Sequence, residues 1–399
     1  MVDSIEIMQQ RLQVLNSSFS PSAPIDQRDL FAGRVTQLIT VMNALNQKGQ
    51  HAILFGERGV GKTSLARVLS GGLNVDGKPL LVASVNCESS MGFTGIWRNA
   101  LRQINLTHIK PGVGYLSEPS AEHIVLADTL PEQLTPSDVR NVLGRLGKSL
   151  FVFDEFDRLQ DTNAKTLLAD TIKMLSDYAV DSTLLLVGVA DSVDALIAEH
   201  QSIERALIQV RMPRMSPPEL EQVIDKGLGK ASMSIAADAK RKIVQLSQGL
   251  PHYTHLLSLY SAQRAASGLK KNVAIEDVRA AIDAALANAQ QSIVGAYHRA
   301  TASPRENLYP QVLLACSMAE PDGLGYFAAV DVRRPMSDIM KRPYEIPAFS
   351  QHLNAFCEDS RGPVLQRTGT ARRYRFRFIN PLMQPYVLMD GIRKGLISG

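Results

Sequence analysis

The stretch LFGERGVGKTSL, residues 54–65, most constrains what this chain can fold into. It contains Gly56-x4-Gly61-Lys62-Thr63 between an apolar run and a helical pattern. Glycines at this spacing let backbone N–H groups converge on phosphate oxygens, while the lysine adds a cation and the hydroxyl can ligate Mg²⁺. The stretch therefore predicts a strand, a phosphate-binding loop and a helix in succession; the alternative is a glycine-rich turn with an exposed lysine. The residues predicted to bind nucleotide phosphate here are Gly56, Glu57, Arg58, Gly59, Val60, Gly61, Lys62, Thr63 and Ser64.

Short apolar runs alternate with helical patterns from Phe31 to about Arg214. The runs are HAILFG, PLLVASVN, SLFVFDEF and TLLLVGVA, and each predicts a strand buried on both faces. Amphipathic helices between such strands are typical of a parallel sheet covered by helices. The predicted fold class is therefore α/β.

Two carboxylates follow the third of these runs. Asp154 stands at the carboxyl end of the strand, where ligands bind in open α/β sheets, and Glu155 comes directly after it. Asp154 is predicted to complete the Mg²⁺ site with Thr63, and Glu155 to polarise an attacking water. An acidic loop without catalytic function is the alternative.

The length of 399 residues predicts more than one domain. We expect an N-terminal helix and Ser/Pro-rich linker over 1–30, the α/β domain over 31–215, a helical domain over 216–290 and a mixed C-terminal domain over 291–399. Ser216 and Glu219 form a predicted capping box at the start of the helical domain. Residues 105–148 form a predicted loop-rich insertion that ends in a helix capped at Thr135, with Pro136 in its first position.

Composition excludes several classes of protein. With 45% hydrophobic and 21% charged residues, the chain is typical of a globular protein, and a net charge of +4 is too small to indicate a nucleic-acid partner by itself. Cys87, Cys316 and Cys357 have no metal-ligand spacing and indicate a reducing compartment. The N-terminal stretch has no signal-peptide pattern and the apolar runs are too short to span a bilayer, so we expect a cytoplasmic protein with no membrane partner.

The C-terminal domain carries clustered positive charge in RGPVLQRTGTARRYRFRF. The stretch predicts two strands, with Tyr374, Phe376 and Phe378 on one face of the second strand and arginines on the other. Such a row can contact duplex phosphates, or it can be a solvated face or dock on an acidic protein. The preceding helix offers Gln351, His352 and Asn354 for base contacts. The arginines of the stretch are Arg361, Arg367, Arg372, Arg373, Arg375 and Arg377.

These motifs together resemble the AAA+ ATPases, in particular their initiator (origin-recognition) and STAND signalling branches, over most of residues 31–290. FAGR, which ends at Arg34, is similar to the box that packs on adenine, and DEFDRL is similar to the initiator form of the acidic motif. TLLLVGVADS resembles the sensor-1 strand, with Asp191 or Ser192 in place of the common Asn. The resemblance implies ATP and Mg²⁺ as cofactors and a winged-helix-like C-terminal domain.

The same resemblance implies that a neighbouring subunit supplies an arginine to the γ-phosphate. Arg205 is the first choice, with Arg211 and Arg214 behind it; a surface or interdomain ion pair is the alternative for each. GLPH has the place of the sensor-2 region and is similar to the Gly-x-Pro motif of STAND proteins, which implies nucleotide contacts for Pro251 and His252.

The expected protein is an ATPase that oligomerises with itself and switches with its nucleotide. Two kinds of target stay open: duplex DNA, favoured by the arginine row, and an effector protein, favoured by GLPH. A nucleotide-binding protein without turnover is the third alternative.

Overall fold

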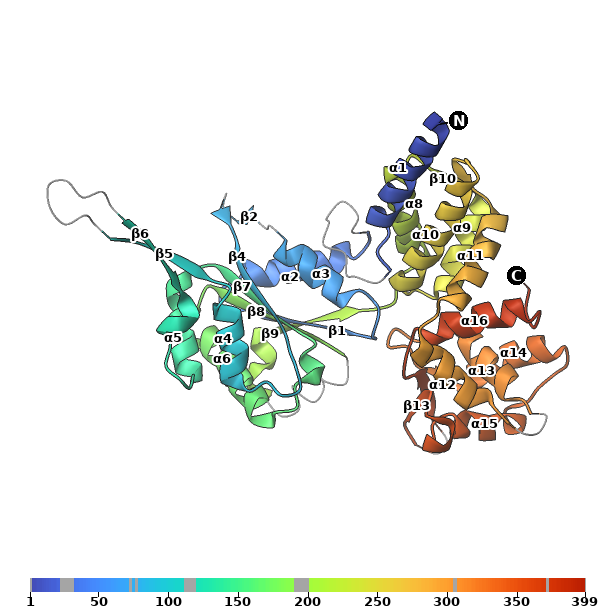
Figure 1. Ribbon diagram of the computed structural model, residues 1–399. Coiled ribbons are helices and arrows are strands. Elements are labelled where there is room, and N and C mark those ends of the chain that lie inside the picture. The colour runs from blue at the N-terminus through green and yellow to red at the C-terminus, as the bar shows by residue number, and fades with distance from the viewer. Residues whose placement is uncertain are drawn as a thin grey trace. The chain divides into compact units, whose positions relative to one another are not determined.

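The computed structural model describes residues 2–21, 32–71, 74–75, 78–110, 120–189, 201–303, 307–370 and 373–398. The chain forms two compact units (Figure 1). The first, here called the sheet unit, contains Arg34–Gly56 and Lys62–Met212. The second, here called the helical unit, contains Met1–Gly33, Glu57–Gly61 and Pro213–Gly399.

A five-stranded parallel sheet forms the centre of the sheet unit. Its strand order is β4-β7-β8-β1-β9. The two strands richest in consecutive apolar residues, β7 and β8, are buried along their whole length, as their sequences predict. The strands are β1 (His51–Gly56), β4 (Leu81–Asn86), β7 (Ser149–Asp154), β8 (Ser182–Gly188) and β9 (Leu207–Met212).

The two edge strands differ from the sequence prediction. The second half of β4 alternates between buried and exposed residues instead of being buried on both faces, so one of its faces is open there. β9 was not predicted as a strand: its sequence LIQVRM places polar residues at alternate positions, which is typical of an edge strand with one exposed face.

Helices cover both faces of this sheet (Figure 1). α2 (Val35–Leu45) and α3 (Lys62–Ser70) pack on one face, and α4 (Phe93–Leu101), α5 (Pro136–Leu146) and α6 (Thr162–Asp177) lie on the other. The predicted cap of α5 is confirmed: the Thr135 side chain accepts from the Asp138 amide, and Pro136 is the first helical residue. Trp97 of α4 is fully buried and packs on Phe151 and Phe153 of β7.

The region predicted as a loop-rich insertion contains an antiparallel pair of strands. β5 (Asn105–Lys110) pairs with β6 (Ser120–Val125) along their full length. The prediction of a loop was wrong here because the connecting stretch is rich in Gly and Pro, which masked the strands on either side. Short elements complete the unit: β2 (Asn74–Val75), β3 (Lys78–Pro79), η1 (Leu126–Thr129), η2 (Phe156–Arg158) and η3 (Gln201–Ala206).

The helical unit begins with α1 (Val2–Ser18), which packs on α8 (Pro217–Lys230) and α10 (Pro251–Ser267). Leu15 and Phe19 are buried there, and the ring of Phe19 fills the space beside Gly227. The predicted capping box of α8 is present between Ser216 and Glu219. α9 (Ala237–Ser247) and α11 (Ile275–Ala287) complete this helical region, which also contains a small parallel pair, β10 (Ser234–Ile235) and β11 (Asn272–Val273), that the all-helical prediction missed.

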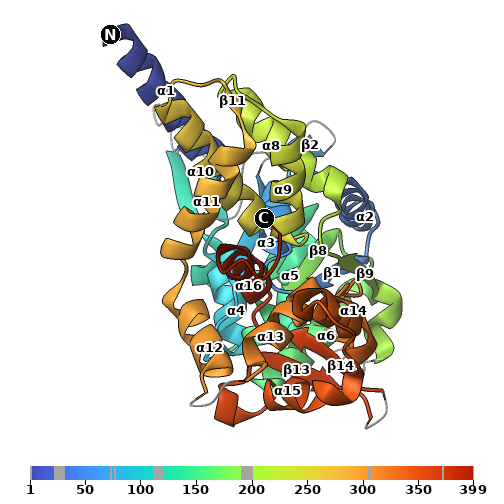
Figure 2. The same cartoon turned by 90° about the vertical axis from the view of Figure 1, so that its right-hand side faces the viewer.

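Residues 291–399 of the helical unit combine helices with an antiparallel three-stranded sheet of order β12-β14-β13 (Figure 2). One continuous apolar core runs from Leu15 of α1 through the helices of 216–290 to Met389 of α16. The helical region and the C-terminal region are therefore one packed body. The elements are α12 (Gln291–Thr301), α13 (Tyr309–Met318), β12 (Phe327–Ala328), α14 (Ala329–Met340), η4 (Ile346–Ala348), α15 (Ser350–Ala355), η5 (Asp359–Arg361), β13 (Leu365–Thr368), β14 (Arg375–Phe378) and α16 (Met383–Arg393).

The three cysteines are free thiols. Cys87 and Cys316 are buried and Cys357 is half-buried, and burial raises the pKa of Cys87 to about 12 and that of Cys357 to about 11. Cys87 and Cys316 are part of the apolar core. None of the helices in the described part of the chain combines the length and apolar character that a membrane crossing requires.

Candidate nucleotide site

The phosphate-binding loop has the conformation that its sequence predicts. β1 ends at Gly56 and α3 begins at Lys62, so the loop joins a strand to a helix N-terminus. Gly59 and Gly61 have φ angles of 84° and 95°, a left-handed region that residues with a side chain rarely adopt. Loops of this shape turn their amide groups toward an anion and add the positive end of the helix dipole.

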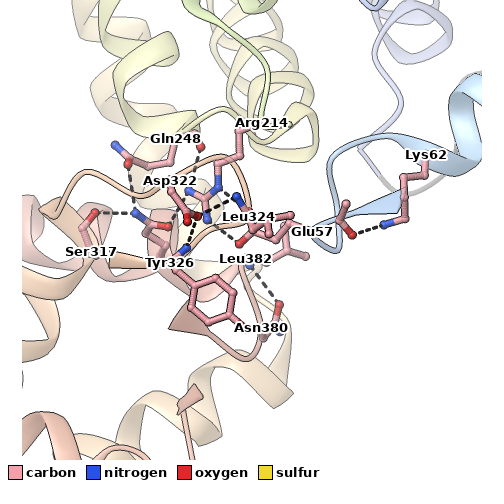
Figure 3. A network of polar contacts seen from close by, with 12 residues as sticks. Glu57, Lys62, Arg214, Gln248, Ser317, Asp322, Leu324, Tyr326, Asn380 and Leu382 are labelled. Carbon is pink, nitrogen blue, oxygen red and sulfur yellow. Dashed lines mark hydrogen bonds and ion pairs between the residues drawn. The ribbon is translucent and has the colours of Figure 1, made fainter. Parts of the chain in front are cut away.

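Lys62, Thr63 and Asp154 lie together at the start of α3 and the end of β7. The Thr63 hydroxyl donates a hydrogen bond to the Asp154 carboxylate, and the positive charge of Lys62 acts on the same carboxylate. Burial raises the pKa of Asp154, an effect opposed by the Thr63 hydroxyl, the Glu155 amide and Lys62. In this structure Lys62 Nζ donates to the Gly56 carbonyl oxygen over 3.1 Å (Figure 3).

Glu155 follows in a left-handed backbone conformation, with φ 52° and ψ 36°. A residue with a side chain is strained there, and such strain is concentrated at functional sites. Its Oε2 accepts from Arg158 Nη1 at 2.7 Å, and both side chains are about half exposed. The next carboxylate, Asp157, accepts from the Val189 amide over 3.2 Å, which ties this turn to the end of β8.

The three candidate arginines have different surroundings. Arg205 is 74% exposed and pairs with Asp177 at 2.7 Å, and Arg211 is exposed on β9. Arg214 is only 11% exposed and is held within the helical unit. Asp191 and Ser192, the candidate sensor residues, lie outside the described residues.

The candidate adenine contacts are Arg34, directly before the start of α2, and Pro251 and His252 at the start of α10. Ala32 packs with Met215, Leu220 and Val223, so the FAGR stretch is fixed to helix α8. Arg34 is buried. Within the helical unit, a Cβ at Gly61 would lie 3.8 Å from Pro251 Cγ.

His252 has a structural partner in this conformation. Its Nδ1 lies 2.7 Å from the carbonyl oxygen of Pro21 and donates to it. Burial lowers the pKa of His252, so the ring is neutral at neutral pH and the Nδ1 proton is committed to Pro21. The bond links the N-terminal segment to the first turn of α10.

The arginines of the C-terminal strands have partners within the protein. Phe376 and Phe378 are buried, so the predicted alternation of β14 is confirmed. Arg375 pairs with Asp322 at 3.0 Å, and Arg377 donates to Gln366 and stacks on Tyr326. Arg361 donates to the carbonyl oxygens of Ala300 and Ala302. Arg367 donates to the side-chain oxygen of Asn354. Arg372 lies outside the described residues.

Packing within the protein leaves few side chains of the predicted base-reading helix available for contact with DNA. His352 is buried against the ring of Tyr309, and the Asn354 side-chain oxygen accepts from Arg367. The interpretation of His352 as a base contact was therefore wrong, because the ring forms part of the core. Gln351 alone of the three candidates is exposed.

One feature of the phosphate-binding loop was missed at the sequence level. Glu57 is buried and forms a bidentate ion pair with Arg214, and Arg214 also donates to Gln384 of α16 (Figure 3). Nothing in the sequence signals this contact, because Glu57 occupies a position of the motif that any residue can fill and its partners are far along the chain.

Part of the chain matches a known family, and its fold is similar to that of solved structures. Residues 45–197 match a family model described as an AAA domain, and the chain matches no curated protein sequence. The Walker-type ATPase PABY2304 of Pyrococcus abyssi is 14% identical with a TM-score of 0.51, over 92% of this chain and 98% of that one. The ORC2 protein of Aeropyrum pernix is 15% identical with a TM-score of 0.49, over 94% of this chain and 99% of that one. Cdc6p of Pyrobaculum aerophilum is 16% identical with a TM-score of 0.46, over 96% of this chain and 99% of that one.

The strands β1, β4, β7 and β8, the phosphate-binding loop after β1 and the Asp154–Glu155 pair after β7 fall within the matched AAA segment, and β9 follows it. The chain has the fold of the AAA+ P-loop ATPases, with an AAA domain matched over residues 45–197.

Proposed function

We propose that this protein is a Mg²⁺-dependent ATPase that works as a nucleotide-driven switch. The observation that carries the proposal is the hydrogen bond between Thr63 and Asp154 beside Lys62, since it brings a hydroxyl, a carboxylate and a cation together at a helix N-terminus. A hydroxyl and one carboxylate are hard oxygen ligands, which suit Mg²⁺ shared with nucleotide phosphates. Such a site needs no cage of three acidic or histidine side chains, and the described residues contain none.

Each residue then has a definite task. The loop amides and Lys62 would bind the β- and γ-phosphates, and Thr63 and Asp154 would hold Mg²⁺, which neutralises phosphate charge when bound. Glu155 would orient the attacking water once it leaves Arg158. In the ion pair, Arg158 holds the Glu155 carboxylate, so activation requires an exchange of partners at this residue.

We propose that the FAGR stretch and the residues Pro251 and His252 contact adenine. The packing of FAGR on α8 and the nearness of Pro251 to Gly61 support this assignment. The helical region 216–290 would then act as a lid on the α/β domain 31–215, with residues 291–399 as the output domain.

Hydrolysis is proposed to need a second copy of the chain, with Arg205 as the arginine supplied in trans. Its exposure and its single, solvent-screened ion pair with Asp177 support this choice, because a partner's phosphate can displace such a pair at little cost. Arg211 is the second choice, being exposed on the adjacent strand.

The proposed target is duplex DNA, bound through the C-terminal region. The order α13, β12, α14, α15, β13, β14 with an antiparallel sheet β12-β14-β13 supports a winged-helix-like region, whose strands carry the arginine row. Because only Gln351 of the candidate readers is exposed, contact is expected with phosphates rather than base edges. Binding of labelled random duplex DNA at low salt, with and without ATP, tests this.

The second candidate is a STAND-like ATPase that assembles with an effector protein. The observation that favours it is the position of the GLPH segment: Leu250 caps the start of α10 and Pro251 lies beside the phosphate-binding loop. No DNA binding at low salt in either nucleotide state would favour this candidate. If phosphate release were the same in wild type and Glu155→Gln, the third alternative, binding without turnover, would hold.

A further inference from the structure

The buried ion pair between Glu57 and Arg214 joins the phosphate-binding loop to the segment that precedes α8. Arg214 Nε lies 2.6 Å from Glu57 Oε2, and Nη2 lies 2.8 Å from Oε1. The two side chains are 11% and 4% exposed. A paired guanidinium and carboxylate this well screened from water interact strongly, and loss of either partner leaves a buried charge.

The third nitrogen of Arg214 connects the pair to the C-terminal region. Nη1 donates to Gln384 Oε1 at 2.7 Å and to the Gln248 carbonyl oxygen at 3.1 Å. Gln384 lies in the first turn of α16 and donates from Nε2 to the Ser317 carbonyl oxygen at 2.9 Å, so its amide is fixed at both ends (Figure 3). The guanidinium therefore contacts the loop, the lid region and α16 at once.

A turn of the C-terminal region closes over the other side of Glu57. Gly325 lies so near that a Cβ there would be 2.5 Å from Glu57 Oε1. Asp322 shapes this turn by accepting from the Leu324 and Tyr326 amides, and its second oxygen pairs with Arg375. Glu57 is thus enclosed by Arg214 on one side and by the turn on the other.

The backbone leaves little freedom to Arg214. Gly249 has a φ of 75°, and a Cβ on it would lie 2.7 Å from the Arg214 Cβ. The Met215 amide also donates to the Gly249 carbonyl oxygen at 2.9 Å. The glycine of GLPH thus has a task in this chain that concerns Arg214, in addition to the proposed nucleotide contact of Pro251.

The network bears on phosphate binding because of the negative charge of Glu57. A phosphate-binding loop collects a polyanion, and a carboxylate within that loop opposes it unless a cation neutralises the carboxylate. We propose that Arg214 is a positioning residue that acts within its own chain. By neutralising Glu57 it allows the loop to bind phosphate, and through Gln384 it couples phosphate binding in the loop to the C-terminal region. This proposal rests on the proposed binding of ATP. Because coupling is reciprocal, bound nucleotide stabilises the docking of α16 and of the 322–326 turn.

A charge cycle tests the first half. Binding of a fluorescent N-methylanthraniloyl ADP with Mg²⁺ is measured for wild type, Arg214→Met, Glu57→Gln and the double variant. Arg214→Met alone is expected to weaken binding at least tenfold, and the double variant is expected to return within about threefold of wild type, since it removes both charges. Arg377→Met is the matched control, because Arg377 also donates to a glutamine, Gln366, but on the C-terminal sheet.

Hydrogen exchange tests the second half and stays informative if Arg214→Met folds poorly. In wild type, ADP is expected to slow exchange of the amides of 322–328 and 383–389, and Gln384→Ala is expected to abolish that response while the variant still binds ADP. Gln366→Ala, the control, should retain it. If the double variant binds no better than Arg214→Met, or if Gln384→Ala keeps the full response, the inference is wrong although the ATPase proposal stands. Failure of wild type to bind any adenine nucleotide would overturn both.

Discussion

The Thr63 hydroxyl donates a hydrogen bond to the Asp154 carboxylate, so the first turn of α3 and the end of β7 are joined by two groups that can share one Mg²⁺. In this structure the carboxylate also accepts from the Glu155 amide at 2.8 Å, which fixes its orientation. The proposed metal site is thus formed by side chains already held together in the protein alone.

Asp154→Asn is expected to abolish the effect of Mg²⁺ on nucleotide binding and to lower phosphate release about 100-fold or more. The reason is that a neutral amide cannot balance the cation, although it can keep the contact with Thr63. Nucleotide titrations with Mg²⁺ and with a chelator measure the effect of Mg²⁺ on nucleotide binding. Asp157→Asn is the control, since Asp157 bonds the Val189 amide and is not assigned to the metal. Unchanged Mg²⁺ dependence in Asp154→Asn would remove this residue from the site.

Arg205→Ala is expected to lower hydrolysis about 1,000-fold while leaving folding and assembly intact. Its ion pair with Asp177 is exposed, so removing it costs about 1 kcal/mol of stability or less, whereas an arginine supplied in trans contributes about 10³-fold or more to turnover. Light scattering with ATP and Mg²⁺ reports assembly, and phosphate release reports turnover. Normal turnover in Arg205→Ala together with inactivity of Arg211→Ala would transfer the role to Arg211.

Substitution of Arg373 and Arg375 by alanine is expected to weaken duplex binding and to flatten its salt dependence. Removing one phosphate contact lowers the slope of log K against log salt by about 0.9 for duplex DNA, so the double alanine variant should have a slope smaller by up to about 1.8. Both side chains are exposed or nearly half exposed. Arg361→Ala should instead destabilise the fold, because Arg361 bonds two carbonyl oxygens of the α12 end and stacks on Tyr309. An unchanged slope in the double variant would exclude the strands as the DNA contact.

Acid is expected to destabilise the protein as the pH falls from about 6.5 to about 4. Burial lowers the pKa of His51 and of His255 from 6.5 to about 4, so within this window the unfolded chain binds more protons than the folded one. The free energy of unfolding therefore falls as pH falls, by up to about 3 kcal/mol for each histidine across the window. Urea unfolding at pH 7.5 and at pH 5 measures it. His51→Gln and His255→Gln should each reduce the dependence; equal stability of wild type at both pH values would contradict the account.

The central strands were predictable because their chemistry is local. Four apolar runs gave β1, β4, β7 and β8, and the phosphate motif fixed the loop and helix between them. β9 was not predicted because its alternating residues reflect an edge position that only the assembled sheet defines. The hairpin β5–β6 was missed because the Gly- and Pro-rich stretch between its strands predicts a loop.

The environment of the phosphate-binding loop was predictable only in part. The motif assigns tasks to Lys62 and Thr63 but leaves Glu57 undefined, and the contact of Glu57 with Arg214, which also bonds Gln384, depends on how three distant segments pack. The orientation of His352 could not be predicted for the same reason. A histidine on a short helix can face DNA or the core, and in this structure its ring packs on Tyr309 in the core.

Phosphate release by wild type and Glu155→Gln, measured with ATP and Mg²⁺ over a range of protein concentrations, tests the ATPase switch most directly. The account predicts that the rate per wild-type molecule rises with protein concentration, because a neighbouring arginine completes the site. It also predicts that Glu155→Gln binds ATP as wild type does and releases phosphate at least about 100-fold more slowly. A rate that is the same in both proteins and independent of concentration would contradict it.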